Sequence, residues 1–246
     1  MGEILYLLIY QPLFNLLIFL YNLVPFPDLG IAVILLTFLV KGVLYPLGIK
    51  AARSQREMQI IQPEVKKIQE KYKDNKEEQA RKIMELYRER KVSPFSGMGP
   101  LIIQLPILIS LFQIFRRGLE NEEMKHLYDF VTVPETVNYH FLGIIDLSSP
   151  HALLAILAAA GQYAQMKMTM KNKEDDNSSE KKDMAKAMQS QMIMFLPGFT
   201  FIVLLSLPSA VGLYWLVTII FSIFQQYIVQ RDKSKENKNG GDKKNN

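Results

Sequence analysis

The stretch VILLTFLVKGVLYPL, Val33–Leu47, is apolar over nearly its whole length and carries one charged side chain, that of Lys41. It lies within a longer segment, Leu29–Ile49, of 21 residues in which Lys41 is again the only charge. A helix needs about 20 apolar residues, at ~1.5 Å each, to cross a bilayer. This segment is therefore predicted to span a membrane. A charge in such surroundings is costly, so the lysine needs an explanation.

Three further segments without Asp, Glu, Lys or Arg have the length of membrane spans. Met98–Phe115 has 18 residues, Leu147–Met166 has 20, and Ala187–Gln230 has 44. The last is long enough for two spans. Pro208 near its middle predicts a break, because proline removes a backbone donor and clashes with the preceding turn. The 246-residue chain is thus predicted to be an all-α polytopic membrane protein with five transmembrane helices.

The 29 basic residues are distributed unequally among the segments that join these spans. Residues 50–97, 167–186 and 230–246 hold 13, 6 and 6 of them, whereas residues 116–150 hold 3. Cytosolic loops of membrane proteins are enriched in Lys and Arg. We therefore expect the three basic segments to be cytosolic, with the N-terminus outside and the C-terminus inside.

Ile4–Val24 is a further uncharged stretch, 21 residues long, and is open to two interpretations. Gln11, Asn15 and Asn22 fall within about 40° of one another on a helical wheel. Such a narrow polar stripe favours a helix lying in the plane of the outer membrane surface. The alternative is a sixth span, which would place an N-terminus with Glu3 and no Lys or Arg in the cytosol.

The first cytosolic segment is predicted to form a helical hairpin. Apolar residues recur there at spacings of three and four on both sides of a polar turn, Lys73–Asn75. They are Met58, Ile61, Val65, Ile68 and Tyr72 before the turn, and Ala80, Ile83, Met84 and Tyr87 after it. Pro63 suits the first turn of a helix, so we expect the hairpin to begin near Gln62. It is either a solvated connector or a docking arm for a cytosolic partner or anionic lipid headgroups, and the sequence favours neither.

The predicted organisation follows the chain from the outer face to the cytosolic tail. Its parts are an in-plane helix and turn (1–28), transmembrane helix 1 (29–50), the cytosolic helical hairpin (51–97), transmembrane helix 2 (98–116), an external loop (117–146), transmembrane helix 3 (147–168), a cytosolic loop (169–186), transmembrane helix 4 (187–207), transmembrane helix 5 (208–230) and a basic cytosolic tail (231–246).

The sequence contains no pattern typical of an enzyme or a metal site. There is no cysteine, and no HExxH, GxSxG or GxxxxGK[ST] motif. No carboxylate lies inside a predicted span, and His126, His140 and His151 lack the spacing of metal ligands. We therefore expect a protein that is not an enzyme and needs no metal or cofactor.

Lys41 can be placed in depth from its position in the first predicted span. At ~1.5 Å per residue it lies ~18 Å below the outer end of the span and ~13 Å above Lys50. Exposure to lipid there would cost at least ~2.5–3.5 kcal/mol, and no predicted span offers it an acid. Two interpretations stay open: a lysine that snorkels to the cytosolic surface and only fixes topology, or one in a water-filled pocket open to the cytosol. We favour the pocket.

Five short segments, in this order and at these spacings, point to a known family. They are QPLF at Gln11–Phe14, VKGVLYPL at Val40–Leu47, IQPEVKKIQEKYK at Ile61–Lys73, KVSPFSGMGPLIIQLPILISLF at Lys91–Phe112 and LPSAVGLYWLVTIIFSIFQQ at Leu207–Gln226. Over roughly Gln11–Arg231 the chain resembles the YidC-type membrane protein insertases of the Oxa/Alb superfamily. The resemblance is to short forms that lack the large outer domain.

The resemblance implies a hydrophilic groove that is open to the cytosol and the lipid and contains one basic residue. Lys41 occupies that position, where most of the family has arginine; the charge is kept but the planar guanidinium is not. The resemblance also places Gln165 and Trp215 in the groove, and it places Leu105, Pro106 and Phe195 on a face along which substrate helices slide. We add Gln104 to the groove as an uncharged hydrogen-bonding residue inside the second predicted span.

The implied function is to accept hydrophilic segments of nascent membrane proteins in the cationic groove and to release their transmembrane helices into the bilayer of a bacterial cell membrane. The implied partners are nascent membrane proteins, the lipid bilayer, and the ribosome through the basic tail and cytosolic loops; whether the Sec translocon takes part stays open. The alternative is a small anion channel or transporter subunit. Two observations argue against the alternative. Lys41 has no counterpart near the outer end of the spans that would complete a path for anions across the membrane, and the sequence contains no inverted repeat.

Overall fold

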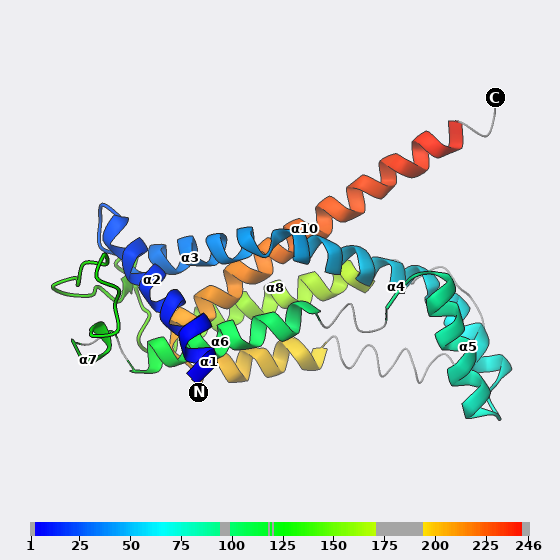
Figure 1. Ribbon diagram of the computed structural model, residues 1–246, viewed down its shortest axis with the longest axis horizontal. Helices are drawn as coiled ribbons and strands as arrows, with labels where there is room; N and C mark the ends of the chain where they lie inside the picture. The colour runs from blue at the N-terminus through cyan, green and yellow to red at the C-terminus, as the bar shows by residue number, and fades with distance from the viewer. Residues whose placement is uncertain (1–2, 94–98, 118, 120, 171–193, 243–246) are drawn as a thin grey trace. The chain divides into compact units, whose positions relative to one another are not determined.

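The computed structural model describes residues 3–93, 99–117, 119, 121–170 and 194–242, and most of these are helical (Figure 1). Most of the predicted cytosolic loop 169–186, the first part of predicted helix 4 (187–193) and the end of the tail lie outside the described residues. The chain divides into two compact units. The first contains Met1–Val43 and Gln104–Ile223, and the second contains Leu44–Ile103 and Phe224–Asn246.

The first unit begins with one continuous helical stretch. α1 (Glu3–Leu5) leads into a π-helical turn, η1 (Tyr6–Tyr10), and then into α2 (Gln11–Leu23). The helix ends at Val24, whose backbone is extended, and Pro25 and Pro27 follow in the turn. In Figure 1, α2 runs obliquely across the direction of α3.

α3 (Leu29–Val43) contains Lys41 in its last turn. Asp28 caps its first turn, because Oδ1 accepts hydrogen bonds from the backbone N–H groups of Gly30 and Ile31, at 2.8 and 3.1 Å. The helix stops before Leu44, and α4 (Tyr45–Lys71) starts immediately after it. Pro46 contributes to the break, because it has no N–H for the carbonyl of residue 42, and as the second residue of α4 it suits the first turn of a new helix. Predicted span 29–50 is thus divided between two helices.

The remaining long helices are α6 (Gly99–Arg117), α8 (Ala152–Met170), Met194–Leu204 and α10 (Ser209–Asp242). The last two are separated by a short break that contains Pro208, where the sequence predicts one. Among the described residues, two helices are long and apolar enough to cross a membrane, Glu3–Leu23 and Ser209–Arg231. The pair α3 and α4 adds a third if it forms one broken span. The count of five spans therefore stays a prediction.

The core of the first unit consists of aliphatic and aromatic side chains that are fully buried. They come from α2, α3, α6, α8 and α10 and include Phe14, Leu17 and Ile18 of α2, Leu29, Val33 and Leu36 of α3, Leu111 and Ile114 of α6, Ala158 of α8, and Val211 and Tyr214 of α10. These residues hold the helices that carry the candidate site.

The segment between α6 and α8 contains a short helix, α7 (Asn121–Met124), and two short antiparallel strands, β1 (His140–Phe141) and β2 (Ile145–Asp146). The strands pair His140 with Asp146 and Phe141 with Ile145. Leu142 and Gly143 turn between them with positive φ angles of 52° and 71°.

The second unit contains the helical hairpin. α4 and α5 (Lys76–Glu89) pack through Ile61, Val65 and Leu86, which are buried. Asn75 caps α5 by accepting a hydrogen bond from the backbone N–H of Glu78 at 3.1 Å. The expectation that the hairpin begins near Gln62 is wrong, since α4 is continuous from Tyr45 through Pro63. Pro63 is exposed, so water can bind the backbone carbonyl that loses its donor there.

Candidate functional site

Lys41 is connected to two other helices by side-chain hydrogen bonds. Its Nζ atom donates to Oε1 of Gln104, on α6, at 3.0 Å. Nε2 of Gln104 donates in turn to the hydroxyl of Tyr214, on α10. Tyr214 is fully buried, whereas Lys41 and Gln104 are half-buried. Three helices that are far apart in the sequence thus contribute to one hydrogen-bonded chain.

The acceptor that Lys41 uses is electrically neutral. None of the ion pairs among the described residues involves Lys41, so no carboxylate compensates its charge there. An ammonium group has three N–H donors, and Gln104 occupies one of them. A charged donor that is not satisfied inside the protein has to be met by water or by a ligand. The arrangement therefore suits an ammonium group that faces a hydrated space.

Several other buried polar atoms of the first unit have no hydrogen-bond partner among the described residues. They include Oγ of Ser110 on α6, Oε1 of Gln162 on α8 and Nε1 of Trp215 on α10. Leaving such a group unsatisfied costs ~1–3 kcal/mol, so each is a place where water or a passing polar group can bind. The interior of this unit thus keeps unused hydrogen-bonding capacity.

The structure brings together two of the residues that the sequence analysis assigned to the groove, Lys41 and Gln104. Gln165 is half-buried on α8 and Trp215 is half-buried on α10, in the same unit. Their part in the site stays a prediction.

Tyr214 is the member of the hydrogen-bonded chain that the sequence analysis did not assign to the groove. A buried tyrosine needs a partner for its hydroxyl, which is a signal that the sequence does contain. The identity of that partner is not readable from one sequence, because Gln104 lies 110 residues earlier.

The polar stripe of α2, which contains Asn15 and Asn22, is hydrogen-bonded to the segment between α6 and α8. Asn15, 2% exposed, donates to the backbone carbonyl of His126 at 3.2 Å and accepts from the backbone N–H of Tyr128 at 2.6 Å. Farther along α2, Asn22 donates to the carbonyl of Thr132 at 2.6 Å. The stripe is therefore satisfied by protein, and its polarity alone does not require contact with water or headgroups.

Residues 138–149, here called the outer clamp, join the first turns of α3 and α10. At α3, Oδ2 of Asp28 accepts a hydrogen bond from the backbone N–H of Leu142 at 2.7 Å, and Phe141 lies directly against Gly30. At α10, Ser209 Oγ donates to the carbonyl of Asp146 at 2.8 Å, and Ala210 N donates to the carbonyl of Leu147 at 3.1 Å. The ends of two core helices are thus held by one short segment.

Comparison with known proteins places this architecture in a family. The sequence pattern of the family described as "60Kd inner membrane protein" matches residues 19–237. The chain belongs to this family. Curated relatives named membrane protein insertase YidC include those of Francisella philomiragia and Francisella tularensis subsp. novicida, 34% and 33% identical over 202 residues. Those residues are 82% of this chain and 32% of each relative, so the chain spans about a third of the length of the curated relatives it matches.

Family membership confirms the resemblance to YidC-type insertases and, together with the apolar helices, makes the chain an integral membrane protein. Neither the family description nor the relatives' name denotes an enzyme. In the described part of the chain, no group of three or more His, Cys, Asp or Glu is arranged to hold a metal ion.

The residues predicted to form a sliding face lie on an exposed apolar surface. Leu105 of α6 is 47% exposed and Phe195 of the helix Met194–Leu204 is 68% exposed, while Pro106 is half-buried. Phe195 stacks on Phe199, with ring centroids 6.2 Å apart. Lipid covers any such surface in a membrane protein, so exposure alone does not distinguish a sliding face from an ordinary lipid-facing one.

Proposed function

We propose that the protein is a membrane protein insertase whose cationic groove, open to the cytosol, contains Lys41. The observation that carries this proposal is the hydrogen bonding of Lys41. Its ammonium group is held by a neutral amide, with no carboxylate bound to it among the described residues. Its charge is therefore available to a group that comes from outside the protein. The family and the name of the curated relatives support the same function.

In this mechanism Lys41 attracts acidic, hydrophilic segments of a nascent membrane protein. Two unit charges 4 Å apart interact by ~4 kcal/mol at an effective dielectric constant of ~20, which is enough to draw a carboxylate into a wet groove. Gln104 positions the ammonium group, and Tyr214 in turn keeps the Gln104 amide oriented. Gln165 and Trp215 are proposed as further groove residues that offer polar and aromatic contacts to the segment.

Release of the substrate helix needs no nucleotide or metal in this proposal. The apolar helix moves along Leu105, Pro106 and Phe195 into lipid, driven by the burial of its apolar surface. A membrane potential that is negative in the cytosol favours the outward movement of acidic residues by ~2.3 kcal/mol per charge per 100 mV.

We further propose that α2 lies in the plane of the outer membrane surface and is followed by five spans. The segment that runs alongside α2, hydrogen-bonded to Asn15 and Asn22, contains Lys125, Asp129 and Glu135. All three of these charged residues are exposed. If α2 crossed the bilayer, these charged groups would be drawn into the hydrocarbon beside it, at several kcal/mol each. The oblique course of α2 relative to α3 also fits a helix in the interface (Figure 1). The N-terminus is then outside and the C-terminus cytosolic.

The proposed partners are nascent membrane proteins, the surrounding lipid, the ribosome and, as a further candidate, the Sec translocon. The ribosome is assigned to the basic tail 231–246 and to the cytosolic loops, because basic segments bind polyanions such as ribosomal RNA.

The function is tested by expressing the protein in bacteria depleted of their own insertase and scoring growth. An insertase restores growth, and the matched control Gly42→Ala restores it equally, since Gly42 has no neighbour within 4 Å of an added methyl group. Failure of a correctly localised protein to restore growth counts against the proposal. Ion conductance by the pure protein in liposomes, without insertion of a substrate, would support the anion channel instead.

A further inference from the structure

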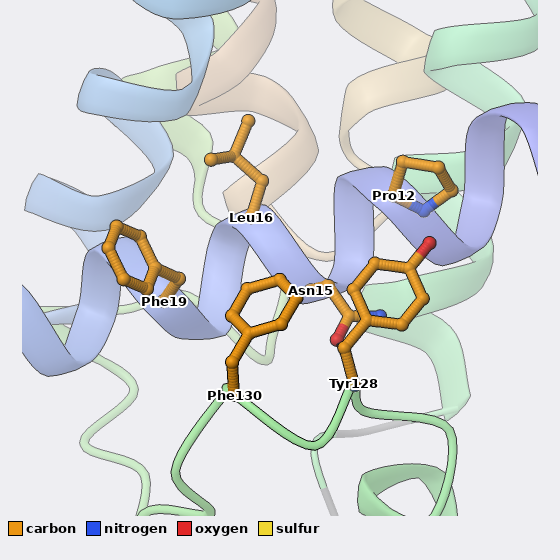
Figure 2. Close-up of a pocket in the computed structure, with 6 residues that line it drawn as sticks. All are labelled: Pro12, Asn15, Leu16, Phe19, Tyr128 and Phe130. Carbon is orange, nitrogen blue, oxygen red and sulfur yellow. The ribbon is translucent and has the colours of Figure 1, made fainter.

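A small cavity lies between α2 and the segment that follows α7 (Figure 2). Its volume is about 280 Å³. The residues that line it are Pro12, Asn15, Leu16 and Phe19 from α2, and Tyr128 and Phe130 from the segment opposite. The Asn15 amide is already bonded to the backbone of Gln11, His126 and Tyr128. The Tyr128 hydroxyl is the only other polar side-chain group in this lining.

Three of the lining residues, Pro12, Leu16 and Phe19, belong to an apolar face that extends along the whole N-terminal helix. The residues of this face follow one another at spacings of three or four, which puts them on one side of a helix. They are Ile4, Leu8, Pro12, Leu16, Phe19 and Leu23. At both ends of this face the side chains are not covered by protein: Ile4 is 74% exposed, Leu8 72% and Leu23 65%. In an integral membrane protein such a face is covered by lipid, so the cavity continues a surface that hydrocarbon already occupies.

We propose that this cavity binds one acyl chain of a membrane lipid, which enters from the exposed face of α2. The lining suits hydrocarbon better than water, because a buried water needs two to four polar partners and the Asn15 amide is already in use. The lipid that surrounds an integral membrane protein supplies acyl chains at this apolar face, which favours such a chain as the occupant. The bound chain contacts both α2 and the Tyr128–Phe130 segment, and so joins the outer segment to the bilayer.

Tryptophan fluorescence offers a direct test, because the chain contains one tryptophan, Trp215. In a Trp215→Phe background, Tyr128→Trp places a probe in the cavity and Leu23→Trp places a control on the same face outside the cavity lining. Tyr128 contributes its backbone N–H, rather than its side chain, to Asn15, so the substitution keeps that bond. The probe used is phosphatidylcholine brominated on its acyl chains, added in small amounts to detergent-purified protein.

The expected result is that the tryptophan at position 128 is quenched at a several-fold lower fraction of brominated lipid than the control at position 23. A second variant, Leu16→Phe, fills the cavity and should remove this preference while leaving quenching at position 23 unchanged. Equal quenching at both positions would overturn the proposal, since it shows general lipid contact only. Quenching at position 128 by acrylamide but not by brominated lipid would overturn it too, because the cavity would then hold water. Circular dichroism of each variant verifies that it is folded, and Phe130→Trp replaces the first probe if Tyr128→Trp is not.

Discussion

The outer clamp and the Lys41 site belong to the same unit but treat polar groups in opposite ways. At the clamp, both carboxylate oxygens of Asp28 accept backbone hydrogen bonds, and the hydroxyl of Ser209 donates to the carbonyl of Asp146. At the other site, the charged group of Lys41 has a single partner among the described residues, the neutral amide of Gln104. Saturated polar groups fix a structure, whereas unsaturated ones are free to bind something else. We infer that the clamp holds the helices and the Lys41 site works on the substrate.

Substitutions at these two places are therefore expected to affect different properties, the stability of the fold in one case and insertion in the other. Substitutions in the clamp should destabilise the protein, and insertion should suffer only as far as the fold is lost. Substitution of Lys41 should leave the fold intact and change insertion directly.

The largest loss of stability is expected for Asp28→Ala. It removes the acceptor of three backbone N–H groups, those of Gly30, Ile31 and Leu142. Hydrogen bonds to charged groups are worth ~1.5–3 kcal/mol each, so we expect a loss of about 3 kcal/mol or more. Thermal unfolding and hydrogen exchange of residues 138–149 measure it. Asp28→Asn, which keeps one acceptor oxygen, should lose less; equal stability of all three proteins would show that the clamp does not depend on Asp28.

A smaller loss is expected for Gly30→Ala. An added Cβ would lie 2.2 Å from Cδ2 and 2.7 Å from Cβ of Phe141, so β1 has to move away from α3. Overpacking of this kind costs ~1–3 kcal/mol. Gly42→Ala on the same helix is the matched control, since it meets no atom within 4 Å and gains up to ~1 kcal/mol of helix propensity. Equal melting temperatures of Gly30→Ala and Gly42→Ala would show that the close contact between Gly30 and Phe141 does not limit stability.

The polar stripe on α2 should show a gradient of effects. Asn15 is buried with three hydrogen bonds, whereas Asn22 is exposed with one. We expect Asn15→Ala to cost ~1–3 kcal/mol and Asn22→Ala less than ~1 kcal/mol, because only the buried site leaves unsatisfied groups behind. Thermal unfolding measures both losses, and hydrogen exchange of the Tyr128 amide, which donates to Asn15, reports the Asn15 change alone. A larger effect of Asn22→Ala would contradict this assignment.

Much of the helical architecture was predictable because it depends on local pattern. The break near Pro208 is visible within a few residues of sequence and is present, and Ile61 and Val65 of the first hairpin stripe are buried as predicted. The second stripe is wrong in part, since Met84 is exposed and Leu86, outside the stripe, is the buried residue of α5. Proline was a less reliable guide elsewhere. α4 passes through Pro63 without interruption, whereas α3 ends at Val43, three residues before Pro46. Whether a proline interrupts a helix depends on the three-dimensional surroundings of its backbone, and these cannot be read from the sequence.

The candidate site was predictable only in part. The charge of Lys41 in an apolar segment is a local feature, and so is the polar side chain of Gln104 within a predicted span. Tyr214 and the partners of the Asn15 amide depend on contacts between residues more than 100 positions apart. A helical wheel shows that Gln11, Asn15 and Asn22 share one face, but not that another part of the chain covers it.

The central claim, that the charge of Lys41 attracts acidic substrate segments, is tested most directly by protease protection of a substrate tail in reconstituted vesicles. Lys41→Arg keeps the charge, Lys41→Met removes it while keeping much of the apolar stem, and Lys41→Glu reverses it. All three should stay folded, because no carboxylate is bound to Lys41 among the described residues and none is left unpaired. Insertion of acidic tails should stay close to normal in Lys41→Arg, fall in Lys41→Met and be lowest in Lys41→Glu, with neutral tails affected least. Equal insertion of acidic and neutral tails by Lys41→Met would contradict the account and leave Lys41 as a snorkelling residue that only fixes topology.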